Sequence, residues 1–148
     1  MRILIKILLL ILVPGIHVTV SGQSNPTSGS KDSTLFDIDN CVNQFTFDDT
    51  VRTAVGYQYW FADKSFLDGR TLKMSVVAPH AATHAPHQHQ EDEFFFVLEG
   101  TAEFYLNGKT VTAKPYASFY CPPNSLHGIR NSGDTELKYL VIKKYEID

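Results

Sequence analysis

Histidine side chains are concentrated in one short stretch of this sequence. Four of the six histidines lie within residues 80–89, which read His80-Ala-Ala-Thr-His84-Ala-Pro-His87-Gln-His89. Imidazole nitrogen is a preferred ligand of divalent transition metals, and Glu93, four residues further on, adds a carboxylate. The run therefore predicts a metal site, and a His-rich solvated loop is the alternative interpretation.

The spacing within the run indicates which side chains share the site. His87 and His89 are two residues apart, so on an extended strand both point to one face, and Glu93 returns to that face after a short bend. A fourth ligand must come from elsewhere, and outside the run His127 is the one other histidine of residues 23–148. The predicted metal ligands are His87, His89, Glu93 and His127. The ion would be one divalent transition metal, since Fe, Mn, Ni and Zn all accept these donors.

Two motifs in this region resemble those of the cupin superfamily. The first cupin motif, G-x5-H-x-H-x3-E-x6-G, is matched by His87, His89, Glu93 and Gly100. The second, G-x5-P-x-G-x2-H-x3-N, is matched by Pro122, His127 and Asn131. Three glycines of the family pattern are replaced, by Ala81, Tyr116 and Asn124. The resemblance implies that the four ligands are retained, and Asn124 is expected to keep its turn because asparagine tolerates positive φ.

The elements that would position these ligands have the pattern of β-strands. Alternating or β-branched segments occur at Thr53 to Phe61, Thr71 to Ala78, Ser118 to Cys121 and Glu136 to Tyr145. Residues 101–113 form a predicted hairpin around Asn107-Gly108, and Asp68-Gly69 is a predicted turn. Periodicity alone predicts an all-β sandwich or barrel, and the resemblance implies the cupin jelly-roll barrel, a double-stranded β-helix.

The amino-terminal region differs in composition from the rest. Residues 1–22 combine Arg2 and Lys6 with an apolar run and small residues at the end, a pattern typical of a secretory signal peptide. A membrane anchor is the alternative, but the apolar run is short for a bilayer span. Residues 23–34 have the composition of a flexible linker, and residues 35–148 are the expected barrel domain. The protein is therefore expected in the periplasm or outside the cell, without a stable membrane anchor.

Charge and cysteine content limit the expected partners. Without the predicted signal peptide, 11 basic and 16 acidic residues remain, obtained by removing Arg2 and Lys6 from the total of 13 basic residues, which gives a net charge of −5. Nucleic acid is therefore not an expected partner. The two cysteines, Cys41 and Cys121, could pair in an oxidising compartment, but two ordinary buried thiols are favoured because Cys121 directly precedes Pro122-Pro123 at a predicted strand end.

Several further polar and aromatic residues are candidates for function. His84 could carry a proton beside the metal or form the cavity rim, and Tyr105 and Arg130 could line the cavity as candidate catalytic residues. Arginine would suit a carboxylate-bearing substrate, and Lys73 is a further polar candidate. For each of these, a solvated or packing role is the alternative. The run Phe94 to Phe96 should direct Phe95 to the cavity and the other two rings outward, which indicates either a homodimer interface or burial under an amino-terminal strand.

Three kinds of function agree with this site. The first is an exported enzyme in which a metal ion acts as a Lewis acid on a small oxygenated substrate such as a sugar or sugar acid, with isomerase or lyase chemistry. The chain looks like small single-domain (type-2) cupins, including those that convert unsaturated uronate sugars to linear keto acids. The resemblance also permits an Fe- or Mn-dependent dioxygenase or an oxalate-degrading enzyme. A non-catalytic module that binds a sugar or a metal is the third interpretation.

Overall fold

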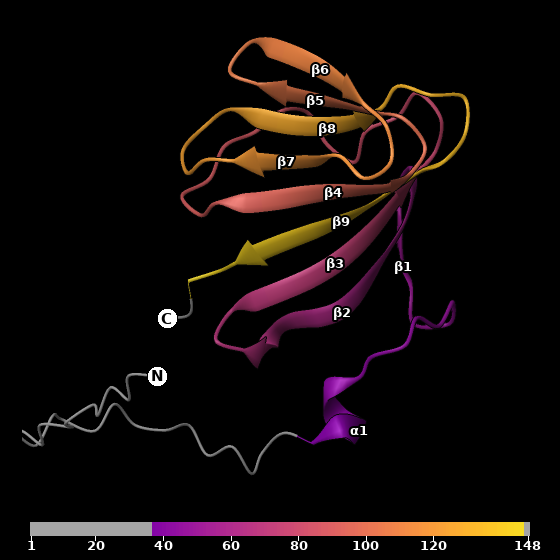
Figure 1. Ribbon diagram of the computed structural model, residues 1–148, viewed down its shortest axis with the longest axis vertical. Helices are drawn as coiled ribbons and strands as arrows, with labels where there is room; N and C mark the ends of the chain where they lie inside the picture. The colour runs from indigo at the N-terminus through magenta and orange to yellow at the C-terminus, as the bar shows by residue number, and fades with distance from the viewer. Residues whose placement is uncertain (1–36, 147–148) are drawn as a thin grey trace, which may run out of the picture. The chain divides into compact units, whose positions relative to one another are not determined.

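The computed structural model describes residues 37–146 (Figure 1). The predicted signal peptide, residues 1–22, and the predicted linker, residues 23–34, lie outside these described residues. Within the described part of the chain, no helix has the length and apolar character needed to cross a membrane.

Residues 37–146 contain nine strands and a single helical turn, which confirms the all-β prediction. The elements in chain order are α1 (Ile38–Cys41), β1 (Val51–Thr53), β2 (Gly56–Leu67), β3 (Arg70–Val77), β4 (Glu93–Glu99), β5 (Ala102–Leu106), β6 (Lys109–Ala113), β7 (Ser118–Cys121), β8 (His127–Asn131) and β9 (Leu137–Lys144).

The strands form two antiparallel sheets. The larger has the order β1-β2-β3-β9-β4-β7, and the smaller has the order β6-β5-β8 and lies beyond β7 at the top of Figure 1. The last strand, β9, is inserted between β3 and β4, so the chain must return from its end to complete the sheet. Buried side chains from both sheets, among them Phe95, Phe104, Ile129 and Leu137, form one hydrophobic core between them. Two antiparallel sheets around one core are the jelly-roll architecture that the sequence predicted.

The turns follow the chemistry of their residues, with one difference in the strands. Asn107 and Gly108 have φ values of 46° and 89°, as a two-residue hairpin turn requires. The single strand predicted from Thr53 to Phe61 is instead divided between β1 and β2. Gly56 begins β2 with a φ of 156°, and a Cβ at this position would lie 2.0 Å from the Val76 carbonyl oxygen. The close approach of the two backbones therefore requires glycine at this point.

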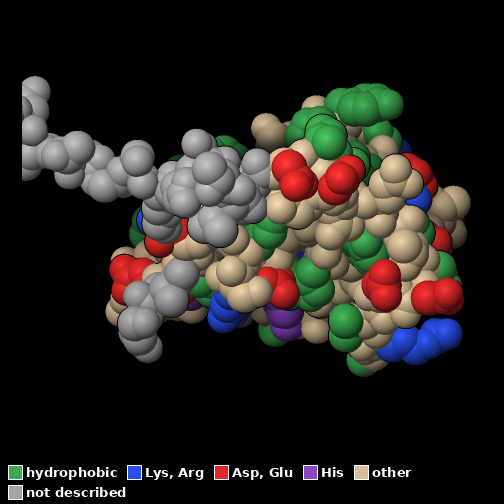
Figure 2. Space-filling model, turned by 90° about the horizontal axis from the view of Figure 1, so that it is seen from below, with side chains coloured by type: hydrophobic (Ala, Val, Ile, Leu, Met, Phe, Trp, Pro, Cys, Tyr) green, Lys and Arg blue, Asp and Glu red, His purple; other side chains and the backbone are tan. Residues whose placement is uncertain are grey.

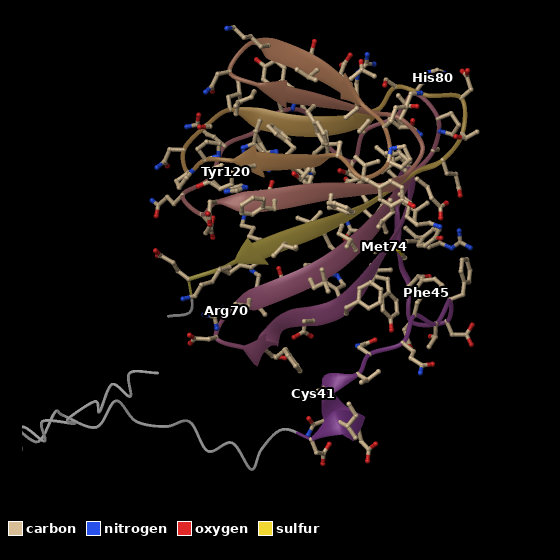
Figure 3. The ribbon with its side chains drawn as sticks, viewed as in Figure 1. Cys41, Phe45, Arg70, Met74, His80 and Tyr120 are labelled. Carbon is tan, nitrogen blue, oxygen red and sulfur yellow. The ribbon has the colours of Figure 1, made fainter. Side chains whose placement is uncertain are left out.

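The apolar side of β3 faces away from the core between the sheets. Met74 and Val76 pack with Tyr59 in a second cluster, and Phe45 lies against Tyr59 with ring centroids 5.0 Å apart. Figure 3 shows Phe45 and Met74 on this side of the larger sheet. Because side chains alternate along a strand, Lys73 is directed to the opposite, inner side.

The two cysteines are free thiols, as the sequence favoured, but the expected burial is wrong for Cys41. Cys41 is exposed in α1, whereas Cys121 is buried at the end of β7. Figure 3 shows Cys41 well away from Tyr120, the residue next to Cys121. The two thiols are therefore too far apart to form a disulfide in this conformation.

Aromatic side chains are exposed on the outer face of the larger sheet. The rings of Phe94 and Tyr120 lie 4.8 Å apart on paired strands, and both are exposed with Ile142. Phe95 is buried, so the predicted inward and outward directions of these two phenylalanines are confirmed. Figure 2, which views the molecule from the end of Figure 1 where α1 and β2 lie, shows further exposed hydrophobic side chains between acidic ones. The predicted homodimer interface stays a prediction.

Candidate metal centre

The four predicted ligands meet at one point inside the barrel. The candidate donor atoms of His87, His89, Glu93 and His127 all lie within 4.8 Å of one another. Glu93 is the first residue of β4 and His127 the first residue of β8, so the two sheets each contribute a ligand. His127 is 0% exposed and Glu93 is 6% exposed, which shields the point from bulk water.

Backbone contacts fix the segment that holds the other two ligands. His87 and His127 exchange N–H···O hydrogen bonds of 2.9 Å in an isolated bridge, and the Asn124 amide donates to the His89 carbonyl at 2.8 Å. The prediction of a regular strand through His87 and His89 was wrong, because only this bridge pairs the segment. The two side chains still reach one point, since their backbones are anchored to the residues around His127.

Hydrogen bonds to backbone carbonyls orient two of the imidazole rings. Nδ1 of His127 lies 2.7 Å from the Ser125 oxygen, and Nδ1 of His89 lies 2.7 Å from the Glu91 oxygen. A carbonyl oxygen only accepts, so Nδ1 is the protonated nitrogen in each neutral ring and Nε2 carries the lone pair. This is the arrangement that orients histidine ligands in metal sites.

The Nε2 nitrogens of these two rings face the carboxylate of Glu93. Nε2 of His127 lies 2.9 Å from Oε1 of Glu93, and Nε2 of His89 lies 3.6 Å from the same oxygen. Nε2 of His89 and Nδ1 of His87 are buried and have no hydrogen-bond partner among the described residues. Lone pairs directed at an acceptor oxygen repel one another unless a proton or a cation lies between them. The donor set therefore fits a divalent cation.

Protonation of the His87 ring is also disfavoured. Burial, followed by the nearby His84 and His127, lowers the pKa of His87 below its usual range. The neutral imidazole is the form that binds a metal, so this shift favours ligation at neutral pH.

Three of the ligands, His87, His89 and Glu93, line a cavity of about 100 Å³ between the sheets. Its other polar lining residues are Gln58, Lys73, Ser75, Thr83, His84, Tyr139, Lys143 and Tyr145. Burial raises the pKa of Tyr139, which keeps its hydroxyl protonated, and burial lowers the pKa of Lys73. The cavity is thus a polar pocket inside an otherwise apolar core.

A second cavity, of about 300 Å³, lies against the other face of the smaller sheet. Tyr105 and Arg130 line this cavity, and Arg130 forms an ion pair with Glu103. The structure therefore does not bring these two candidate catalytic residues to the metal ligands. His84 does reach them, since its ring lies 4.3 Å from the ring of His87 and lines both cavities. His80 instead pairs with Asp134 at 3.0 Å on the surface.

The replaced glycines leave the loops in their left-handed conformations. Tyr116 has a φ of 71° and Asn124 a φ of 58°, so both positions adopt the backbone that glycine would favour. Asn124 keeps its turn, as expected. The motif residue Asn131 is 0% exposed, and its amide nitrogen donates to the carbonyls of Val77, Ala78 and Thr135. It ties β8 to the end of β3 and so holds the two sheets around the site.

Comparisons with known proteins agree with this architecture. A family model described as a cupin domain matches residues 73–143. A 5-nitrosalicylic acid 1,2-dioxygenase from Bradyrhizobium sp. is 34% identical over 56 residues, which cover 38% of this chain and 27% of the dioxygenase. The chain thus matches little more than a quarter of that relative's length.

Solved structures show the same fold at low sequence identity. A predicted oxalate decarboxylase from Thermotoga maritima has a TM-score of 0.56 and 24% identity, over 60% of this chain and 78% of the other. KdgF from Halomonas sp. has a TM-score of 0.59 and 20% identity, over 70% of this chain and 96% of the other. At these identities the similarities support the fold alone, so the chemistry must be inferred from the residues of the site.

Proposed function

Because this chain belongs to the cupin superfamily, we propose that it is an exported metal-dependent enzyme acting on a small oxygenated substrate such as a sugar or sugar acid. The observation that supports metal use is the convergence of two Nε2 lone pairs on one oxygen of Glu93, inside a buried cavity. Export is supported by the composition of residues 1–22 alone.

Isomerase or lyase chemistry agrees with the groups around the site. A bound divalent ion would supply Lewis-acid polarisation of a substrate carbonyl or hydroxyl oxygen. His84, exposed at the mouth of the cavity and in ring contact with His87, is placed to accept and release a proton. The Tyr139 hydroxyl, which stays protonated, can donate a hydrogen bond to a substrate oxygen. Phe95 closes the apolar side of the cavity and limits the entry of water.

Oxygen-dependent chemistry with Fe or Mn is the second candidate. It is favoured by the similarity to the 5-nitrosalicylic acid 1,2-dioxygenase, whose matched segment is short. The same donor set would hold either metal, because imidazole and carboxylate suit both. Oxygen consumption separates the two candidates, since an isomerase or lyase works without oxygen.

Metal analysis of protein purified without chelator tests the proposal. The wild type should carry about one equivalent of a transition metal, and His87→Ala and His127→Ala should lose it. Arg130→Ala is the matched control, since it changes the same strand, β8, on the side away from the ligands, and should keep the metal. A wild type that neither contains nor takes up Fe, Mn, Ni or Zn would contradict the proposal and favour a non-catalytic binding module.

A further inference from the structure

Two lysines share the cavity with the metal ligands. Lys73 on β3 and Lys143 on β9 both line it, and both belong to the inner side of the larger sheet. In the register of the sheet, Lys73 is opposite Val141 and Lys143 is opposite Thr71, so the two lysines are diagonal neighbours on adjacent strands. Diagonal neighbours on one face are within reach of each other when the side chains are long.

Two lysines and one glutamate carry the charges that line this end of the cavity, and Glu91, outside the lining, lies 3.5 Å from Lys143. Among the described lining residues, Glu93 is the sole carboxylate, against the two ammonium groups. Glu93 is also the carboxylate that meets His89 and His127, so its charge is directed at the metal site. A bound divalent ion would therefore leave the cavity with net positive charge, which favours an anionic ligand.

The two lysines differ in their existing partners. Nζ of Lys143 lies 3.5 Å from Oε2 of Glu91 and 4.7 Å from the ring centre of Tyr145. Nζ of Lys73 lies 5.0 Å above the ring of Trp60, and within residues 37–146 no carboxylate is in ion-pair distance of it. A contact with an aromatic face attracts the cation but provides no negatively charged partner. Glu93 therefore acts on Lys73 only at longer range, and Lys73 is the lysine of the pair that has no direct anionic partner among these residues.

From this geometry we infer that the cavity binds the carboxylate group of its substrate, with Lys73 as the main ionic partner and Lys143 as a second cation beside it. The inference rests on the proposed function, because it takes the molecule bound in the cavity to be a substrate. It names an organic acid anion, such as a sugar acid, in place of a neutral sugar. The cavity of about 100 Å³ encloses the anionic end of such a molecule, since this volume equals that of about three water molecules.

The single tryptophan supplies a local measurement. Trp60 is the one tryptophan of the chain and is paired with Lys73 across β2 and β3. Its fluorescence should therefore report an anion that reaches the ammonium group of Lys73. Acetate and D-galacturonate are the charged probes, and acetamide and D-galactose are their uncharged counterparts. The titrations use the full chain, both loaded with Zn(II) and metal-free.

The result expected is saturable binding of both anions to the wild type and little binding of the neutral counterparts. Lys73→Met should weaken anion binding by about tenfold or more, because the methionine keeps the volume and removes the charge. Lys138→Met is the matched control: Lys138 is on the same strand as Lys143 but pairs with Glu99 at 2.9 Å outside the cavity. Its anion binding should equal that of the wild type, and the metal content of all variants should be unchanged.

Three results would overturn the inference: equal anion binding by Lys73→Met and the wild type, equal binding of the neutral counterparts, or no saturable binding of either anion. If Lys73→Met does not fold, as judged by circular dichroism, Lys143→Met provides the same test with a smaller expected loss. A wild type that takes up no metal but binds acetate through Lys73 would refute the proposed metal-dependent function and support the anion site. Failure of the proposed metal-dependent function and failure of the inferred anion site therefore give different results.

Discussion

The two cavities share His84 and Ile129 in their walls, yet they differ in size and in chemistry. The outer cavity is about three times larger, at about 300 Å³ against about 100 Å³, but its ion pair between Arg130 and Glu103 is accessible to water. The inner cavity is small and holds side chains that are largely buried. Burial, rather than volume, decides where charges and lone pairs become strong enough to bind a metal.

The same contrast between the inner and outer sides of the sheets applies to the thiols. Burial raises the pKa of Cys121 to about 12, whereas Cys41 is exposed in α1. Relative to a thiol of pKa 9.0, the thiolate fraction of Cys121 below pH 9 is about 1000-fold lower, so its alkylation should be slower by at least this factor. Ellman's reagent should titrate one thiol in the native protein and two in urea. Two fast thiols in the native state would show that the interior is open.

A pair of glutamates tests the contrast directly. Glu93→Gln keeps the size of the side chain but removes the charge that faces His89 and His127, and should lower metal affinity by more than about 100-fold. Glu103→Gln on the outer side should leave metal affinity unchanged. Competition with a coloured chelator measures both affinities. Equal affinities in the two variants would break the distinction between inner and outer carboxylates.

A second pair lies on β8. Asn131→Ala should lower the free energy of unfolding by about 2–3 kcal/mol, because one buried and two partly buried hydrogen bonds to backbone carbonyls lose their donor. Arg130→Ala, whose side chain is exposed, should lower the free energy of unfolding much less, because surface ion pairs contribute little to stability. Urea unfolding of the metal-free proteins measures both changes. A cost for Arg130→Ala as large as that for Asn131→Ala would mean that the outer ion pair also holds the sheets together.

The smallest effect is expected in a loop. Tyr116 holds a φ of 71° and is 82% exposed, so it adopts a strained backbone with little compensating burial. Tyr116→Gly should raise the free energy of unfolding by about 1 kcal/mol. Tyr116→Ala is the control, since it removes the ring without relieving the strain. Equal stability of the two variants would contradict the strain explanation.

The sequence predicted most of the candidate metal site because its signal is local. His87, His89 and Glu93 lie within seven residues, and His127 was found through motif spacing and by the count of histidines. The turn at Asn107 was predicted for the same reason, because its residue type decides its backbone. The division of the first long strand at Gly56 was missed, since it depends on the approach of β3.

The other cavity residues were only partly predictable. Alternation along β3 separates Lys73 from Met74, but it does not tell which side faces the cavity when both sides are buried. The apolar side proved to be the outer one, because aromatic residues of β2 and of the segment before β1 cover it. Lys143 was missed altogether. Its alternation with Tyr139 and Val141, which also line the cavity, was the available signal.

By itself, then, the sequence determined the strand-forming pattern, the turns and the four donors, because residue type and short spacing decide these features. Only the tertiary structure decided that Lys73 and Lys143 accompany the donors, whereas Tyr105 and Arg130 line another cavity. The physical reason is that alternation with a period of two residues divides a strand into two faces but does not determine which face lies inside. The insertion of β9 between β3 and β4, and the packing of the two sheets, make that assignment.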